Sequence, residues 1–126
     1  MLTETKNAEL LPQHLEHIAS QKTRDAFMFL VGAAATDNRF QCHGTVKGVI
    51  RDFRYFDASR LQRYAFIVNR ESLLFYFRSP AVKSGKHDFA EIQALFTDVS
   101  ENNSGEWTVC IQDLAEAQKL SDLLQK

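Results

Sequence analysis

The stretch YAFIVNRESLLFYFR, from Tyr64 to Arg78, decides the fold that we expect for this chain. Residues 64–68 and 73–77 are rich in aromatic, aliphatic and β-branched side chains, and each run is too short for a typical helix. The four polar residues at 69–72 favour a turn. Pro80 then ends the second run, because proline has no N–H to donate to a sheet. The pattern predicts two strands joined as a β-hairpin.

Both faces of this predicted hairpin are apolar. Side chains alternate along a strand, so Phe66 and Val68 lie opposite Ala65 and Ile67, while Leu73, Phe75 and Phe77 lie opposite Leu74 and Tyr76. A face in contact with water is normally polar, so we expect something to cover each side. Helices of this chain can cover one side. The second cover could be more of this chain, another subunit or a ligand.

The length and composition indicate one ordinary globular domain over residues 1–126. Apolar residues make up 44% and charged residues 25% of the chain, which argues against disorder. Cys42 and Cys110 lie far apart and form no CxxC motif, as expected of free thiols in a cytoplasmic protein. We expect no secretory leader and no membrane span, because the start lacks an h-region and no apolar run is long enough.

Charge is unevenly distributed along the chain, although the net charge is only -1. Residues 39–88 carry ten basic and four acidic side chains, whereas residues 89–126 carry two basic and seven acidic ones. The basic section can pair with acidic helices of this chain or of an identical subunit, or it can face an anionic partner such as nucleic acid. The overall balance favours the first interpretation.

The rest of the chain adds helices and two further strands. We expect helices over 8–20, 25–35 and 88–99, strands over 49–56 and 107–111, and a final helix after Asp113. The segment 25–35 leaves two alternatives, because its alanines favour a helix while Phe27, Phe29 and Val31 alternate as in a strand. With the helical alternative, the order predicts an α+β fold with a mostly antiparallel sheet of about four strands, and helices at the N-terminus and on the sheet.

Four polar side chains are candidate helix N-caps. They are Asn7, Thr23, Asp88 and Asp113. Glu91 stands at the reciprocal position of a capping box begun by Asp88.

Candidate catalytic and metal sites are weak. His14 and His17 have the spacing of two ligands on one helix face, but no third ligand is evident and a metal needs three or four. Cys42 could act as a nucleophile only if the fold brought His43 or His87 to it. The chain contains no P-loop, GxGxxG, GxSxG or HExxH motif. We therefore expect no metal and no cofactor, and we lean against an enzyme.

Two sets of side chains are candidate binding surfaces. An apolar ligand or protein partner would meet the sheet aromatics Phe66, Phe75, Tyr76, Phe77 and Trp107, although such residues are more often core. Nucleic acid would meet the arginine- and aromatic-rich strands 49–78, through Arg51, Arg54, Arg60, Arg63, Arg70 and Arg78. Cross-strand ion pairing is the simpler explanation for these arginines. We favour a binding module that forms homodimers, with nucleic-acid association as the alternative.

Two blocks of the sequence carry a resemblance to known proteins. YAFIVNRESLLFYFRSP (64–80) and GEWTVCIQDLAEAQKL (105–120) resemble segments of small bacterial proteins of the kind encoded by integron gene cassettes. The resemblance covers no catalytic or binding motif, so it assigns no site residue.

Overall fold

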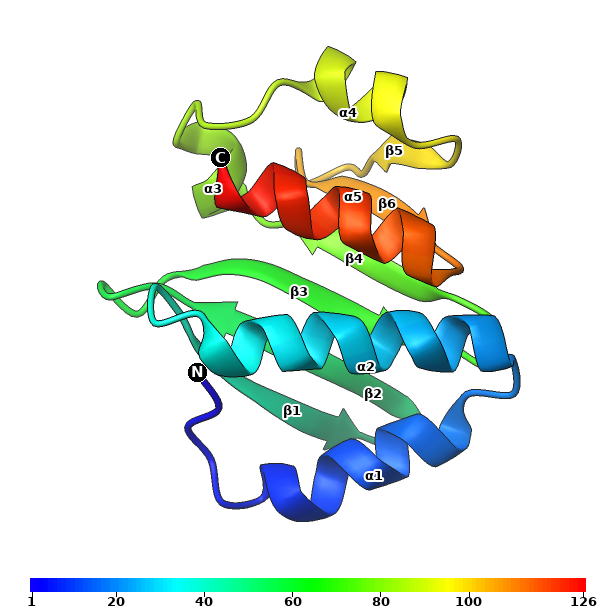
Figure 1. Ribbon diagram of the computed structural model, residues 1–126. Coiled ribbons are helices and arrows are strands. Elements are labelled where there is room, and N and C mark those ends of the chain that lie inside the picture. The colour runs from blue at the N-terminus through cyan, green and yellow to red at the C-terminus, as the bar shows by residue number, and fades with distance from the viewer.

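The computed structural model describes residues 1–126 as a six-stranded antiparallel sheet with three long helices against it (Figure 1). The strands are β1 (Gln41–Lys47), β2 (Ile50–Phe56), β3 (Gln62–Val68), β4 (Leu73–Phe77), β5 (Val99–Glu101) and β6 (Trp107–Ile111), in the spatial order β1-β2-β3-β4-β6-β5. The helices are α1 (Asn7–His17), α2 (Gln21–Thr36), α3 (Ser79–Lys83), α4 (Phe89–Leu95) and α5 (Leu114–Gln125). The predicted α+β class is confirmed, but the sheet has six strands rather than about four.

The predicted hairpin forms the centre of this sheet. β3 pairs with β4 in the register Phe66–Phe75 and Ile67–Leu74, and the Asn69 N–H donates to the Ser72 carbonyl across the turn at 3.0 Å. β2 flanks the hairpin on one side and β6 on the other. The hairpin prediction is therefore confirmed.

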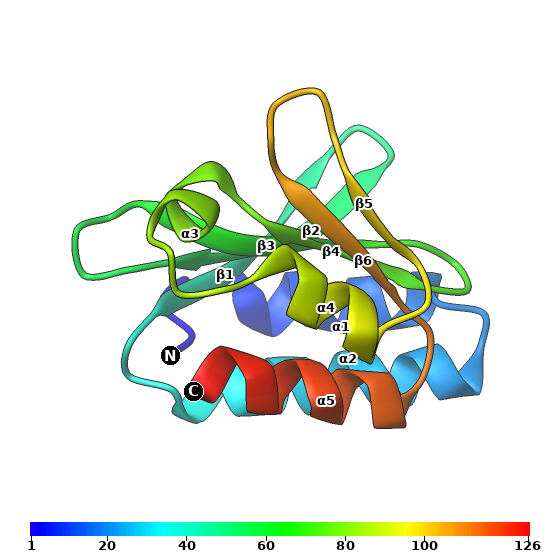
Figure 2. The same cartoon turned by 90° about the horizontal axis from the view of Figure 1, so that it is seen from above.

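Helices α1, α2 and α5 all lie on one face of the sheet (Figure 2). The core between the layers is a cluster of 25 buried residues. Phe27 of α2, for example, meets Phe66 of β3 edge to face, with ring centroids 6.0 Å apart. Crossing a bilayer would need a longer and more apolar helix than any of the five. One of the two covers that the apolar hairpin requires is thus supplied by the chain's own helices.

Residues 25–35 are helical, but α2 begins four residues earlier than predicted. Its N-cap is Ser20, whose side chain accepts a bond from the backbone N–H of Thr23, so the assignment of Thr23 as cap was wrong. The Thr23 hydroxyl instead lies 3.0 Å from the carbonyl of Glu71 and 2.9 Å from that of Gln112. This buried side chain ties the first turn of α2 to two loops of the sheet.

Strand β1 was missed because its sequence lacks a strand pattern. Gly44 lies in the middle of β1, at the point where α1 packs directly on the strand. A Cβ atom at this position would lie 3.1 Å from the Leu11 side chain and 3.3 Å from His14 Nε2. The glycine therefore allows a close contact between the helix and the strand.

The edge of β1 is partly covered by the N-terminal segment. Leu2 forms a parallel bridge with Cys42. The Asn7 side chain accepts a hydrogen bond from the Gly44 N–H at 2.8 Å and donates to the Cys42 carbonyl at 3.4 Å. Asn7 thus acts as a substitute strand residue rather than as the predicted helix cap, and it shields an edge that could pair with other chains.

Two other predicted caps are confirmed, while one helix end is corrected. Asp88 accepts from the Ala90 N–H, and Asp113 accepts from the Glu116 N–H. The helix predicted to reach residue 99 stops at Leu95, because Val99 pairs with β6 in the short strand β5.

Candidate functional site

The sheet face opposite α1, α2 and α5 has no long helix over it (Figure 2). We call it the open face. Its centre carries Ala65 and Ile67 from β3 and Leu74 and Tyr76 from β4, paired Ala65–Tyr76 and Ile67–Leu74. Ala65 is buried by its neighbours, while the other three side chains are half-buried. We call these four residues the central patch, of which a single chain leaves Ile67, Leu74 and Tyr76 partly in contact with water.

Polar networks border the central patch on both sides. On the β2 side, the Asp52 carboxylate accepts hydrogen bonds from the Thr45 hydroxyl and, at 3.1 Å, from Arg54 Nε. On the β6 side, Arg78 Nε lies 2.5 Å from the Glu106 carboxylate. Such partly exposed pairs contribute little to stability. They give the open face the apolar centre and polar rim that protein interfaces have.

The two hairpins at the edges of the open face carry opposite charge. The β1–β2 hairpin contains Lys47, Arg51 and Arg54 against Asp52, whereas residues 98–106 contain Asp98, Glu101 and Glu106 and no basic residue. Both hairpins rise above the open face, at opposite edges of the sheet (Figure 2). Arg51 and Glu101 alternate onto the helix side, so the open face itself keeps Lys47 and Arg54 with Asp52 at one edge, and Asp98 and Glu106 at the other.

Most of the aromatic residues predicted to contact a ligand lie on the other face. Phe66, Phe75 and Phe77 have no exposed surface, and Trp107 is 9% exposed, all beneath the helices. Tyr76 alone belongs to the open face. The four buried aromatic residues belong to the core, which is the more common role of such residues. A ligand would have to displace helices to reach them.

The six arginines proposed for nucleic acid do not form one surface. Arg54 and Arg78 lie on the open face, whereas Arg51 alternates onto the helix side and Arg70 lies in the β3–β4 turn. Ion pairs engage Arg54 with Asp52, Arg63 with Asp57 and Arg78 with Glu106. Pairing with this chain's own carboxylates thus accounts for three of the six.

The fold does not activate Cys42. Its side chain is fully buried, and burial raises the pKa of the thiol to about 12. His43 alternates onto the open face and stacks on Phe56 at 5.4 Å, while His87 Nε2 is 2.6 Å from the Tyr64 hydroxyl. Neither histidine is hydrogen-bonded to the thiol, so the pair needed for a cysteine nucleophile is not assembled.

His14 anchors α1 to the sheet. Its Nε2 donates to the Asp52 carbonyl at 2.8 Å, which leaves Nδ1 buried and without a partner. Burial is the main cause that lowers the pKa of His14, so the ring is neutral at pH 7. No group of three or more His, Cys, Asp and Glu side chains is arranged to hold a metal.

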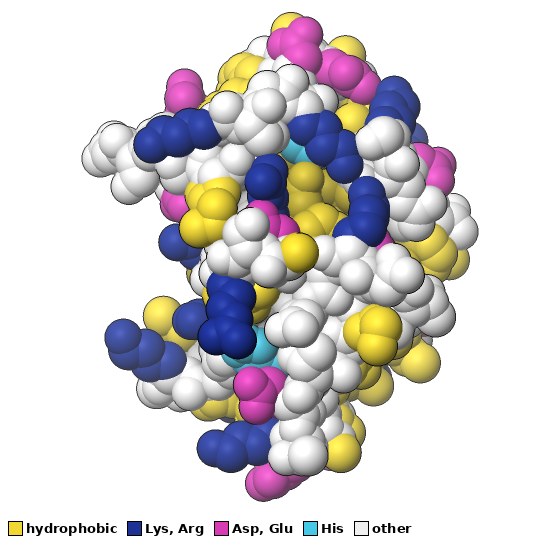
Figure 3. Space-filling view, turned by 90° about the vertical axis from the view of Figure 1, so that its left-hand side faces the viewer, with side chains coloured by type: hydrophobic (Ala, Val, Ile, Leu, Met, Phe, Trp, Pro, Cys, Tyr) yellow, Lys and Arg dark blue, Asp and Glu magenta, His cyan; other side chains and the backbone are white.

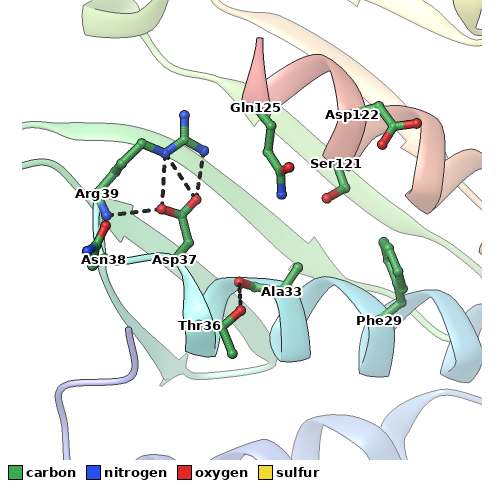
Figure 4. A pocket seen from close by; sticks show the side chains of 9 residues that line it. All are labelled: Phe29, Ala33, Thr36, Asp37, Asn38, Arg39, Ser121, Asp122 and Gln125. Atoms are coloured by element: carbon green, nitrogen blue, oxygen red, sulfur yellow. Dashed lines mark hydrogen bonds and ion pairs between the residues drawn. The ribbon is translucent and has the colours of Figure 1, made fainter.

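A polar groove of about 620 Å³ runs between the C-terminal halves of α2 and α5 (Figure 4). At one end Asp37 is paired with Arg39 at 2.7 Å. Asp122 lies at the other end, with Ser121 and Gln125 between the two carboxylates. The acidic groups do not converge, so this groove does not form an acid–base pair.

The alternation of charged and apolar residues in β2 indicates the open face, but the prediction of the site gave more weight to the large aromatic residues. Asp52 and Arg54 occupy the strand positions opposite to the apolar Phe53 and Tyr55. Charged side chains at alternate positions identify the solvent side of a sheet. Asp52 pairs with Ile67 of β3, and Ile67 pairs with Leu74 of β4, so both apolar residues lie on this solvent side. Neither was among the predicted site residues.

No protein-family model, curated protein or solved structure matches this chain. Function is therefore inferred from the chain's own residues and their arrangement.

Proposed function

We propose that this chain is a small non-enzymatic binding module that acts as a homodimer, with the open faces of two copies packed together. The observation that carries the proposal is the central patch, which a single chain leaves half-exposed at the middle of its sheet. Packing against a second copy would supply the second cover that the hairpin sequence requires.

Charge favours a second copy as the occupant of this face. A two-fold axis that runs along the strands, between the two sheets, places β1–β2 of one copy over β5–β6 of the other. The basic hairpin of each copy then meets the acidic hairpin of its partner, twice per dimer. An axis across the strands would instead place like charges together. The proposal therefore commits to the first arrangement.

The shape of the face also suits a dimer. Twisted sheets of the same hand pack face to face at a small angle, and in this arrangement the raised hairpins of one copy meet those of the other at the two edges. Strands spaced about 4.8 Å apart and of five to seven residues give a face of roughly 24 by 20 Å. This flat area of about 480 Å² is smaller than the roughly 800 Å² that each partner buries in a standard interface, a figure that counts the full accessible surface of the side chains.

The cysteine chemistry supports a non-enzymatic role in a reducing compartment. The two thiols are unpaired, as is usual for cytoplasmic proteins. The candidate nucleophile Cys42 is held as a neutral thiol inside the core.

Sedimentation equilibrium tests this proposal through a matched pair of variants. Ile67→Glu places a charge in the central patch, and Met28→Glu places the same charge on α2, where Met28 is 59% exposed on the helix side. We expect the wild type and Met28→Glu to be dimers and Ile67→Glu to be a folded monomer by circular dichroism. A monomeric wild type at concentrations well above micromolar, or a dimeric Ile67→Glu variant, would refute the proposal.

A further inference from the structure

A second concave site lies at one end of the sheet, away from the central patch. The turn between α2 and β1, the β2–β3 loop and the segment before α4 surround a cavity of about 430 Å³. Phe40 and Tyr64 form its apolar floor, with ring centroids 5.6 Å apart. In Figure 3, Lys and Arg side chains surround a hollow in which hydrophobic atoms are visible.

Three cations line this cavity, but only two of them are available to a ligand. Arg39 uses its nitrogens on the Asp37 carboxylate and on the Leu124 carbonyl at the end of α5. Arg63 donates to Asp57 only through Nε, at 2.7 Å, so its two terminal amino groups are free. Lys86 Nζ donates one bond, to the Leu124 carbonyl at 2.9 Å, and keeps two donors.

The cations at the rim are incompletely neutralised. The pKa of Lys86 is lowered, first by burial and then by the positive charges of Arg39 and Arg63. Two carboxylates, Asp37 and Asp57, balance three cations here. Capping of the α5 C-terminus explains Arg39 and one bond of Lys86, but not the terminal amino groups of Arg63. A bound anion would relieve the remaining repulsion.

Tyr64 contributes its aromatic ring, and not its hydroxyl, to the floor of the cavity. The Tyr64 hydroxyl is engaged with His87 Nε2 at 2.6 Å, and burial lowers the pKa of His87 to about 4, so the imidazole is neutral at pH 7. The polar end of Tyr64 is thus satisfied inside the protein. Only a small part of the Tyr64 and Phe40 residues, 2% and 9% of their surfaces, is left as an apolar floor beneath the cations.

We propose that this cavity binds a small organic oxyanion, a carboxylate or phosphate monoester on a flat apolar body. The oxyanion would lie between the Arg63 guanidinium and the Lys86 ammonium, which form charge-assisted hydrogen bonds with such groups. The apolar body would lie against Phe40 and Tyr64. This site is separate from the open face, so it does not depend on the proposed homodimer.

Titration of the ¹⁵N-labelled protein with three probes tests the site by NMR. Benzoate carries both features, benzamide lacks the charge, and inorganic phosphate lacks the apolar body. We expect benzoate to produce saturable shifts at Arg63 Nε and at the Ser59 amide, with weaker binding of phosphate and none of benzamide. Equal binding of benzamide would overturn the electrostatic half of the proposal, and equal binding of phosphate would overturn the assignment to an organic anion.

Variants separate loss of ligand contact from loss of fold. Arg63→Gln and Lys86→Gln should each weaken benzoate binding about tenfold, since each removes a charged hydrogen-bond donor. Arg63→Lys keeps a cation and should retain part of the affinity. Lys83→Gln, on the exposed side of α3, removes a cation that does not line the cavity and should have no effect. Equal weakening by Lys83→Gln would show general charge attraction rather than a site.

Discussion

Protonation of His87 should destabilise the fold at mildly acidic pH. The ring is 8% exposed, and its Nε2 bonds to the Tyr64 hydroxyl. Burial, the largest cause, and the positive charge of Lys86 together lower the pKa of His87 from 6.5 to about 4, against the opposing effect of Glu91. Between these two pKa values the unfolded chain binds a proton at His87 that the folded chain does not bind.

The stability contributed by the neutral ring is therefore present above pH 6.5 and is lost as the pH falls toward 4. A difference of 2.5 pKa units at 1.36 kcal/mol each corresponds to about 3 kcal/mol in the free energy of unfolding. His14 and His17, whose pKa values are also lowered by burial, add to the loss in the same direction. Asp37 and Asp57, whose pKa values are lowered mainly by arginine partners, contribute only at lower pH, below the ordinary carboxyl value.

Urea unfolding followed by circular dichroism, from about pH 7 to pH 4, measures this loss. The variant His87→Gln cannot titrate in this range, while its side chain can still accept a hydrogen bond from Tyr64. We expect the wild type to lose about 3 kcal/mol more than His87→Gln over the same interval. Parallel loss in the two proteins would refute the assignment of the effect to His87.

Three further predictions follow from single features of the structure. Thr23→Val removes the hydroxyl that donates to the Glu71 and Gln112 carbonyls and should lower the free energy of unfolding by about 1–3 kcal/mol. The control Thr36→Val, at an exposed site, should change it by less than about 0.5 kcal/mol. Similar losses for the two variants in urea unfolding would contradict the role of Thr23. Cys42 should resist iodoacetamide in the folded protein and react only on unfolding, and rapid native-state labelling found by mass spectrometry would show an open core. A fluorescent single-stranded oligonucleotide should not bind at low salt, because half of the candidate arginines are ion-paired, and binding with a steep salt dependence would restore the nucleic-acid alternative.

The central hairpin and helices α1, α4 and α5 were predictable because their signals are local, whereas the short helix α3 was missed. Residues 64–77 combine strand propensity with a turn, and the stripes of α1, α4 and α5 follow helical spacing. β1 could not be recognised, because Gly44 is explained by the approach of α1, a contact between segments about thirty residues apart in sequence. β5 has three residues, too few for a period.

The candidate sites were less predictable than the fold. Alternation separated the two faces of each strand but did not show which face the helices would cover, so the larger aromatic residues were chosen as the ligand surface. Their size is the reason that they lie in the core. The oxyanion cavity combines Arg39 from the turn between α2 and β1, Arg63 from the start of β3 and Lys86 from the segment before α4, and no sequence spacing links them.

Charge reversal and mixing test most directly whether two copies pack face to face with opposite hairpins in contact. One variant carries Lys47→Glu and Arg54→Glu, and the other carries Asp98→Lys and Glu106→Lys. We expect each variant alone to sediment as a monomer and the equimolar mixture to form a heterodimer, with wild-type dimers weakening as salt rises. Two variants that dimerise as tightly as the wild type, or a mixture that stays monomeric, would contradict the proposed arrangement.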